Sequence, residues 1–218
     1  MPLNTIAEGV WEARDRLGPF PIRMTVLKTA EGVVLWSQVP IDDALAESID
    51  RIGEVAAIVS PNLFHYAFVN DAKARYPRAR VLTTPGLETK RPGIAPDART
   101  PDPGFAGLQV FQLAGCDRVE ESVVFHAASG TLVVTDLIFN VKAATNVREW
   151  MVFRLMAGTL GRAGQSRLWR FLRTDADAHR ASLDEVLALP IKQVVMAHGE
   201  PITTDAKETL VRALGLSG

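Results

Sequence analysis

Several features that mark whole classes of protein are scarce in this chain of 218 residues. It has one cysteine, Cys116, which excludes an intrachain disulfide framework and favours a reducing compartment. No run approaches the ~18 consecutive apolar residues of a membrane span. Residues 1–20 also lack the apolar core of a signal peptide. We therefore expect a cytoplasmic protein without a membrane span.

The chain also has no large excess of positive or negative charge, because 24 basic residues balance 25 acidic ones and leave a net charge of -1. Such a balance gives no general attraction to nucleic acid, and we expect no nucleic-acid partner. The sequence contains no GxSxG, Walker A, GxGxxG or HExxH motif, so the chemistry tied to those motifs is not indicated. What is present is a 47% hydrophobic content, enough to build the core of a single domain over residues 1–218.

Periodicity and turn residues predict a mixed order of strands and helices. Strands are expected at 21–29, 33–39, 55–60, 80–84, 107–115, twice within 121–136, and at 191–198. Helices are expected at 41–53, 62–77, 146–158, 165–173, 176–189 and 204–214, and the segment 85–105 is expected to be a long functional loop or lid. This order indicates layered sheets covered by helices, not a purely parallel doubly wound sheet.

Three polar residues stand just beyond predicted buried strands, where clefts form at the edge of a sheet. Asp136 ends "TLVVTD", His198 ends "QVVMAH", and His65 follows "VAAIVS" by a few residues. If their strands are neighbours and point the same way, these side chains converge. Two imidazoles and one carboxylate suit zinc, or iron or manganese, with positions left open for water. Such an ion lowers the pKa of bound water toward neutrality.

Each of these residues also has an ordinary structural interpretation. Asp136 is typical of a turn or helix cap, His198 of a loop histidine bonded to backbone, and His65 of a core residue among aromatic neighbours. Similar judgements apply elsewhere: the pattern favours a solvated strand start for Asp117, Glu120 and Glu121, and solvent exposure for His179.

The order of these features resembles the metallo-β-lactamase superfamily, which opens with a β-hairpin and carries a metal loop, a later Gly-Asp and a terminal His-Gly. Residues 60–92, "SPNLFHYAFVNDAKARYPRARVLTTPGLETKRP", resemble a branch of unknown function with a Pro-Asn…His segment at the metal loop. The resemblance covers about residues 20–205. It implies an α/β fold, the four-layer αββα sandwich of two mixed sheets, with the site at one edge between the sheets.

The departures from the superfamily pattern predict a reduced site. Its His-x-His-x-Asp-His loop would place histidines where this chain has Pro61 and Leu63, so the first metal position is expected to be lost. Asp136 and the His198-Gly199 pair remain, and His65 falls in or beside a ligand position. Cys116 stands near a position that the superfamily fills with histidine. It is a candidate fourth ligand, although a lone cysteine also serves as a small buried hydrophobe.

The segment 147–174 combines six arginines with several aromatic residues. The pattern favours a helical cover whose apolar side chains pack on the sandwich while the arginines stay in water. A substrate-facing lid or an interface, including a homodimer, is the alternative.

Two functional hypotheses follow from the sequence. The first is a divergent hydrolase with one metal ion, zinc or else iron or manganese, acting on a small-molecule substrate. The second is a non-catalytic member that has lost its metals and binds a ligand or partner in the same cleft.

Overall fold

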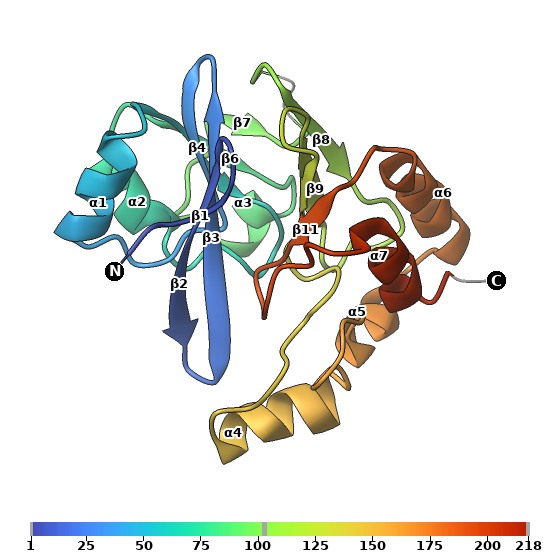
Figure 1. The fold of residues 1–218 in the computed structure, drawn as a ribbon. Coiled ribbons are helices and arrows are strands. Elements are labelled where there is room, and N and C mark those ends of the chain that lie inside the picture. The colour runs from blue at the N-terminus through green and yellow to red at the C-terminus, as the bar shows by residue number, and fades with distance from the viewer. Residues whose placement is uncertain (1, 102–103, 217–218) are drawn as a thin grey trace.

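The computed structural model describes residues 2–101 and 104–216, whose strands form two mixed β-sheets (Figure 1). The seven-stranded sheet runs in chain order through β1 (Asn4–Ala7), β2 (Val10–Leu17), β3 (Phe20–Thr29), β4 (Gly32–Trp36), β5 (Val55–Ser60), β6 (Arg80–Thr83) and β7 (Ala98–Arg99). The four-stranded sheet has the order β11-β10-β9-β8, built from β8 (Leu108–Gln112), β9 (Ser122–His126), β10 (Thr131–Val133) and β11 (Gln193–Val195). Pairing is antiparallel from β1 to β4 and parallel from β4 to β7. In the smaller sheet only β10 and β11 are parallel.

Helices cover the outer face of each sheet. The first sheet carries α1 (Asp43–Asp50), α2 (Val69–Arg75) and α3 (Leu87–Lys90). The second carries α5 (Arg167–Leu172), α6 (Ala176–Leu187) and α7 (Ala206–Leu214). The expected four-layer αββα sandwich is confirmed.

Alternating side chains explain why the sheets pack on both faces. Successive residues of a strand point to opposite sides, and in β4 Val33 and Leu35 pack under α1 and α2 while Val34 and Trp36 enter the layer between the sheets. In β11 Val195 faces the other sheet. Burial of these three apolar layers is the main driving force for the fold. No helix among the described residues is long and apolar enough to cross a membrane.

The structure differs from the predicted elements in three places. The helix expected at 62–77 begins only at Val69, because the side chain of Asn62 accepts hydrogen bonds from the backbone N–H of Phe64 and His65 and holds a turn there. Strands β1 and β2 were not predicted, since β2 mixes apolar and charged residues. The segment 85–105 is not all loop, because it contains α3 and β7; its residues 102–103 lie outside the described residues.

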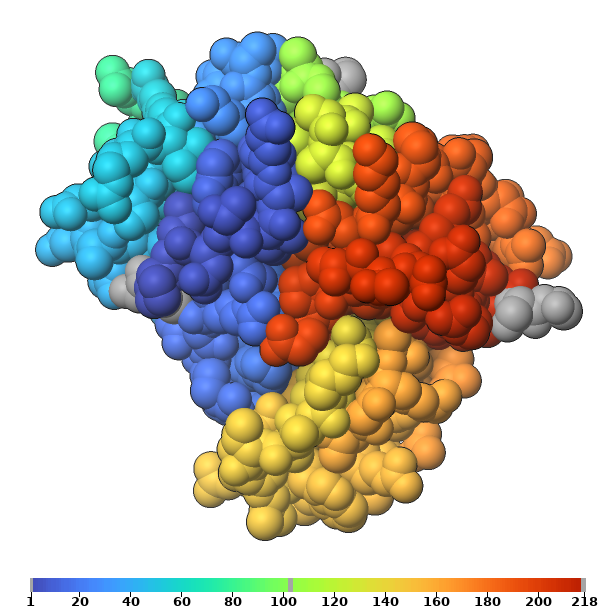
Figure 2. All heavy atoms as spheres, in the orientation of Figure 1, coloured from blue at the N-terminus to red at the C-terminus, as the bar shows by residue number. Residues whose placement is uncertain are grey.

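Residues 139–160 form a separate small core below the two sheets. Helix α4 (Val147–Trp150) continues into the π-helical turn η1 (Met151–Met156). Phe153 of η1 is buried with Phe139, and Phe20 from the tip of the β2–β3 hairpin packs edge-on against it. Figure 2 shows this segment, yellow to light orange, lying against the blue hairpin. The packing places a helical wall beside the sheet edge where the chain's candidate site lies.

Candidate metal centre

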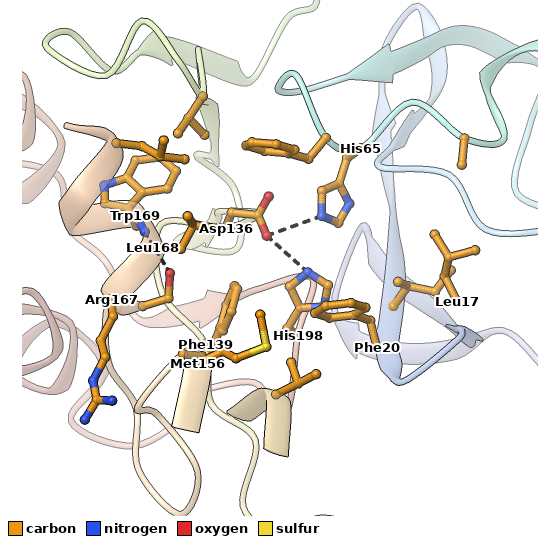
Figure 3. A pocket seen from close by; sticks show the side chains of 18 of the residues that line it. Leu17, Phe20, His65, Asp136, Phe139, Met156, Arg167, Leu168, Trp169 and His198 are labelled. Carbon is orange, nitrogen blue, oxygen red and sulfur yellow. Dashed lines mark hydrogen bonds and ion pairs between the residues drawn. The ribbon is translucent and has the colours of Figure 1, made fainter. Parts of the chain in front are cut away.

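Three strand ends bring His65, Asp136 and His198 together at one edge of the sandwich (Figure 3). Asp136 and His198 follow the parallel neighbours β10 and β11, so both emerge at the same end of the second sheet. His65 follows β5 of the first sheet. One potential ligand atom from each residue lies within 4.8 Å of the others. Over residues 2–101 and 104–216 this is the one group of three or more His, Cys, Asp or Glu residues so placed.

Both imidazoles face the same carboxylate oxygen. Asp136 Oδ1 lies 3.1 Å from Nε2 of His198 and 3.4 Å from Nε2 of His65. The three side chains are 7–14% exposed, so the group is shielded from water but still reached from the cleft. Burial alone would raise the pKa of Asp136, but the charges and hydrogen bonds of His65 and His198 outweigh it and hold that pKa well below its usual range.

The opposite nitrogen of each imidazole is bonded to the protein. His198 Nδ1 lies 2.6 Å from the carbonyl oxygen of Pro21 in β3, an acceptor, so Nδ1 carries a proton. His65 Nδ1 lies 2.8 Å from the Ser37 hydroxyl. Ser37 adopts a left-handed backbone with φ +60°, which turns the chain at the end of β4. Both rings are thereby oriented with Nε2 toward Asp136, as second partners orient metal-binding histidines.

The His198 loop is fixed by a glycine and by a buried arginine. Gly199 has φ +102°, and a Cβ there would lie 2.2 Å from the carbonyl of Asn140, so only glycine fits. Arg23 of β3 is buried and donates to the carbonyl oxygens of Met196 and Gly199 on either side of His198. Its Nε donates to Glu12 at 2.5 Å. The first sheet, through Arg23, therefore holds the loop that carries His198.

A buried glutamate fixes the Asp136 turn, which the sequence did not reveal. Glu121 is fully buried, not solvated as predicted, and its carboxylate accepts from the backbone N–H groups of Thr135, Asp136 and Leu137 at 2.7–3.1 Å. Burial, followed by the Asp136 charge, raises the pKa of Glu121 to about 8 against the lowering effect of these bonds. Without Glu121 the turn that presents Asp136 would have three unpaired buried donors.

Asn62 connects the two halves of the site. Its Oδ1 accepts from the backbone of Phe64 and His65, and its Nδ2 donates to Asp136 Oδ2 at 2.9 Å. The same Nδ2 lies 3.4 Å from Glu121. An Asn directly after a strand is a turn former, so the sequence could indicate the turn but not the contact with Asp136.

The structure does not bring Cys116 to this group. Its buried thiol lies 3.1 Å from the carbonyl oxygen of Leu113, to which it donates, and burial raises its pKa to about 12. A protonated thiol is a poor metal ligand. Cys116 is therefore a small buried residue of the core. His179 was expected to be exposed but is buried; its Nδ1 lies 3.1 Å from the carbonyl oxygen of Ala114 and its ring contacts Trp169.

An apolar pocket of about 580 Å³ opens above the three residues. The hairpin tip supplies Leu17 and Phe20, the loop after β5 supplies Phe64 and Phe68, and residues between 152 and 172 supply much of the remaining wall. The predicted cover thus contributes side chains directly to the cleft.

Neither a protein-family model nor a curated sequence matches this chain. Solved structures do match along nearly the whole length. A metallo-β-lactamase from Pontibacter korlensis superposes with a TM-score of 0.66 at 19% identity, covering 99% of this chain and 97% of its own. The enzyme from Hirschia baltica gives 0.64 at 13%, covering 97% and 96%. The metallo-β-lactamase FIM-1 from Pseudomonas aeruginosa, in its mono-zinc form, gives 0.63 at 14%, covering 97% and 93%. The chain is a divergent protein with the metallo-β-lactamase fold.

Proposed function

We propose that this protein is a hydrolase that binds one transition-metal ion through His65, Asp136 and His198. The proposal rests on one contact, in which two hydrogen-bond acceptors, Nε2 of His198 and Oδ1 of Asp136, face each other. Because Nδ1 of His198 donates to Pro21, Nε2 of a neutral ring is an acceptor, and it lies 3.1 Å from a carboxylate oxygen. Two acceptors repel at this distance unless a metal ion lies beside them, or a proton on Nε2 makes the contact an ion pair.

The spacing of the donors also fits a metal ion. Ligand atoms ~2.1 Å from a tetrahedral zinc ion lie roughly 3.4 Å apart, and the observed Oδ1–Nε2 separations are 3.1 and 3.4 Å. Two imidazoles and one carboxylate suit zinc, and also iron or manganese. One structure of the same fold, that of the metallo-β-lactamase FIM-1, is a mono-zinc form.

The residues of this chain would hold the ion and prepare the cleft. When bound, the ion would supply a Lewis acid and activate water near neutral pH. Asn62 keeps the Asp136 carboxylate in place, and Ser37 and Pro21 keep the imidazoles turned toward it. Phe139 packs edge-on over the His198 ring with 4.7 Å between centroids and excludes water from that side. The substrate would be a small molecule bound in the pocket above.

A second function, ligand binding without chemistry, is favoured by a different observation. A single proton shared among the two imidazoles and Asp136 would also satisfy the facing acceptors, and Asn62 already bonds the second carboxylate oxygen. In that case the pocket would bind its ligand with no metal.

Elemental analysis separates the two functions. We expect protein purified without chelator to hold about one equivalent of metal. Asp136→Asn and His198→Gln should each lower this occupancy at least tenfold after dialysis. Asp117→Asn and His126→Gln serve as matched controls, since both residues lie outside the group, and should retain wild-type occupancy. Less than about a tenth of an equivalent in the wild type, unchanged after incubation with zinc, iron or manganese, would refute the metal hypothesis.

A further inference from the structure

The pocket above the candidate metal centre is a lipophilic cleft, not a polar one. Of the nine large hydrophobic side chains that are most exposed among the described residues, five line it, and they are Leu17, Phe64, Met156, Leu168 and Phe171. Exposed apolar side chains that gather around one opening mark a binding site, because a soluble surface rarely keeps such patches without a role. Their gathering at this mouth points to an apolar occupant.

The lining offers little to a charged or strongly polar substrate. Apart from His65 and His198 of the candidate centre, Arg167 is the one basic side chain among the described lining residues, and its Nη1 donates to the carbonyl oxygen of Leu155 at 2.8 Å. Gln38 Nε2 donates to the carbonyl oxygens of Leu35 and Val59. The remaining acid, Asp136, belongs to the candidate centre. Figure 3 shows the Arg167 guanidinium directed away from the candidate centre, so an anion placed over the centre would face the Asp136 carboxylate without that cation beside it.

The cleft extends on both sides of the candidate centre. Figure 3 shows Leu17 on one side and Leu168 and Trp169 on the other, with Asp136, His65 and His198 between them. Its volume of about 580 Å³ falls within the range of small-molecule sites. A long chain can therefore lie along the apolar walls while a bond within the molecule rests over the centre.

We propose that the substrate carries a long acyl or alkyl chain, which this cleft binds beside the bond to be hydrolysed. The assignment rests on the proposed function for the reaction, but chain binding itself requires no metal. The bond would be an ester-type linkage, cleaved by addition of water to give a carboxylic acid and an alcohol or thiol.

Binding of hexanol, octanol and decanol to the metal-free protein, measured by calorimetry, tests the cleft without any chemistry. Burying a methylene contributes ~0.8 kcal/mol, so affinity should rise about fourfold per methylene, or up to about 15-fold per two-carbon step. A total change of less than about twofold across the series would overturn the inference.

Two neighbouring variants locate the binding. Met156 lines the cleft and is 68% exposed, while the adjacent Leu155 is 53% exposed and does not line it. Met156→Gln should weaken decanol binding about three- to tenfold, whereas Leu155→Gln should leave it unchanged. Because both side chains are exposed, both variants should fold. Equal losses in the two variants, or none in either, would mean that the alcohols bind elsewhere and would refute the assignment.

Chromogenic hexanoate, octanoate and decanoate esters, tested with zinc-loaded protein, separate this inference from the proposed function. We expect kcat/KM to rise with chain length. If alcohols bind in the cleft but no ester is cleaved faster than by Asp136→Asn, hydrolysis fails and the chain-binding assignment stands. If esters are cleaved with no length preference and alcohols do not bind, hydrolysis stands and this assignment fails.

Discussion

At the scale of single residues, Gly199 is a position where the backbone leaves no room for a side chain. It combines φ +102° with an approach that would place a Cβ 2.2 Å from the Asn140 carbonyl. Gly199→Ala must therefore strain the backbone or push the His198 loop away from the 140–141 segment. We expect a loss of about 2–4 kcal/mol in the free energy of unfolding, measured by urea titration.

Gly18 provides the matched control for this substitution. It also has a positive φ, +60°, but nothing lies within 4 Å of a Cβ built there. Gly18→Ala should cost only the conformational strain, about 1 kcal/mol. Equal losses for the two variants would show that the close contact with Asn140 is not what requires glycine at position 199.

The residues of the site differ in how visible they were in the sequence. Asp136 and His198 could be predicted because each directly follows a buried strand, and parallel neighbours β10 and β11 deliver them to one edge. Glu121 could not, because it starts a strand beside two other acidic residues and looks solvated. Only the fold shows that three backbone N–H groups converge on its carboxylate. Long-range polar contacts of this kind leave no local pattern.

At the scale of elements, the β2–β3 hairpin supports the His198 loop through a buried ion pair. Arg23 bonds Glu12 on β2 and two carbonyl oxygens of the loop after β11. Arg23→Met should lower the free energy of unfolding by about 3 kcal/mol, because it leaves Glu12 and both carbonyls without their buried partner. Arg14 still pairs with Glu12, which limits the loss. Urea unfolding would measure it.

A double variant separates charge burial from loop support. Arg23→Met with Glu12→Leu removes the uncompensated carboxylate and should recover most of the lost stability. Like Arg23→Met alone, the double variant should retain less metal than the wild type, since the carbonyls beside His198 remain without Arg23. Full recovery of both properties would contradict a role for Arg23 in positioning the loop.

The same hairpin shows what periodicity could not predict among the elements. The alternation of β3 and β4 was visible, and both strands lie close to their predicted limits. Strand β2 was hidden because Glu12 and Arg14 occupy it. Glu12 can be buried because Arg23 of the neighbouring strand and Arg14 both pair with it. A strand whose buried face carries a charge pair therefore lacks the hydrophobic alternation by which strands are found.

At the scale of the whole molecule, buried histidines make stability depend on pH. Burial lowers the pKa of His179 below its ordinary value of 6.5, and it also lowers that of His126. Below pH ~6.5 the unfolded chain binds protons that the folded state refuses, so the free energy of unfolding falls as pH decreases. The stability is fully present above that pH.

His179→Gln tests this dependence away from the candidate centre. Urea unfolding between pH 7.5 and 5 should give a flatter decline than in the wild type, by up to about 1.4 kcal/mol per pH unit. His126→Gln should flatten the curve independently. An unchanged slope in both variants would show that neither ring resists protonation in the folded protein.

The hydrogen bonds behind the three candidate ligands bear on how a metal ion would exchange and on how the protein can evolve. The three candidate ligands are held in place by residues that are not ligands themselves, namely Ser37, Pro21 and Asn62. The sandwich therefore preorganises the site before any ion binds. In zinc fingers, by contrast, the ion itself supplies the free energy of folding. Here we expect an ion to enter and leave by diffusion through the cleft, with no refolding. A lineage built in this way can change its metal, or give it up, while keeping the same scaffold.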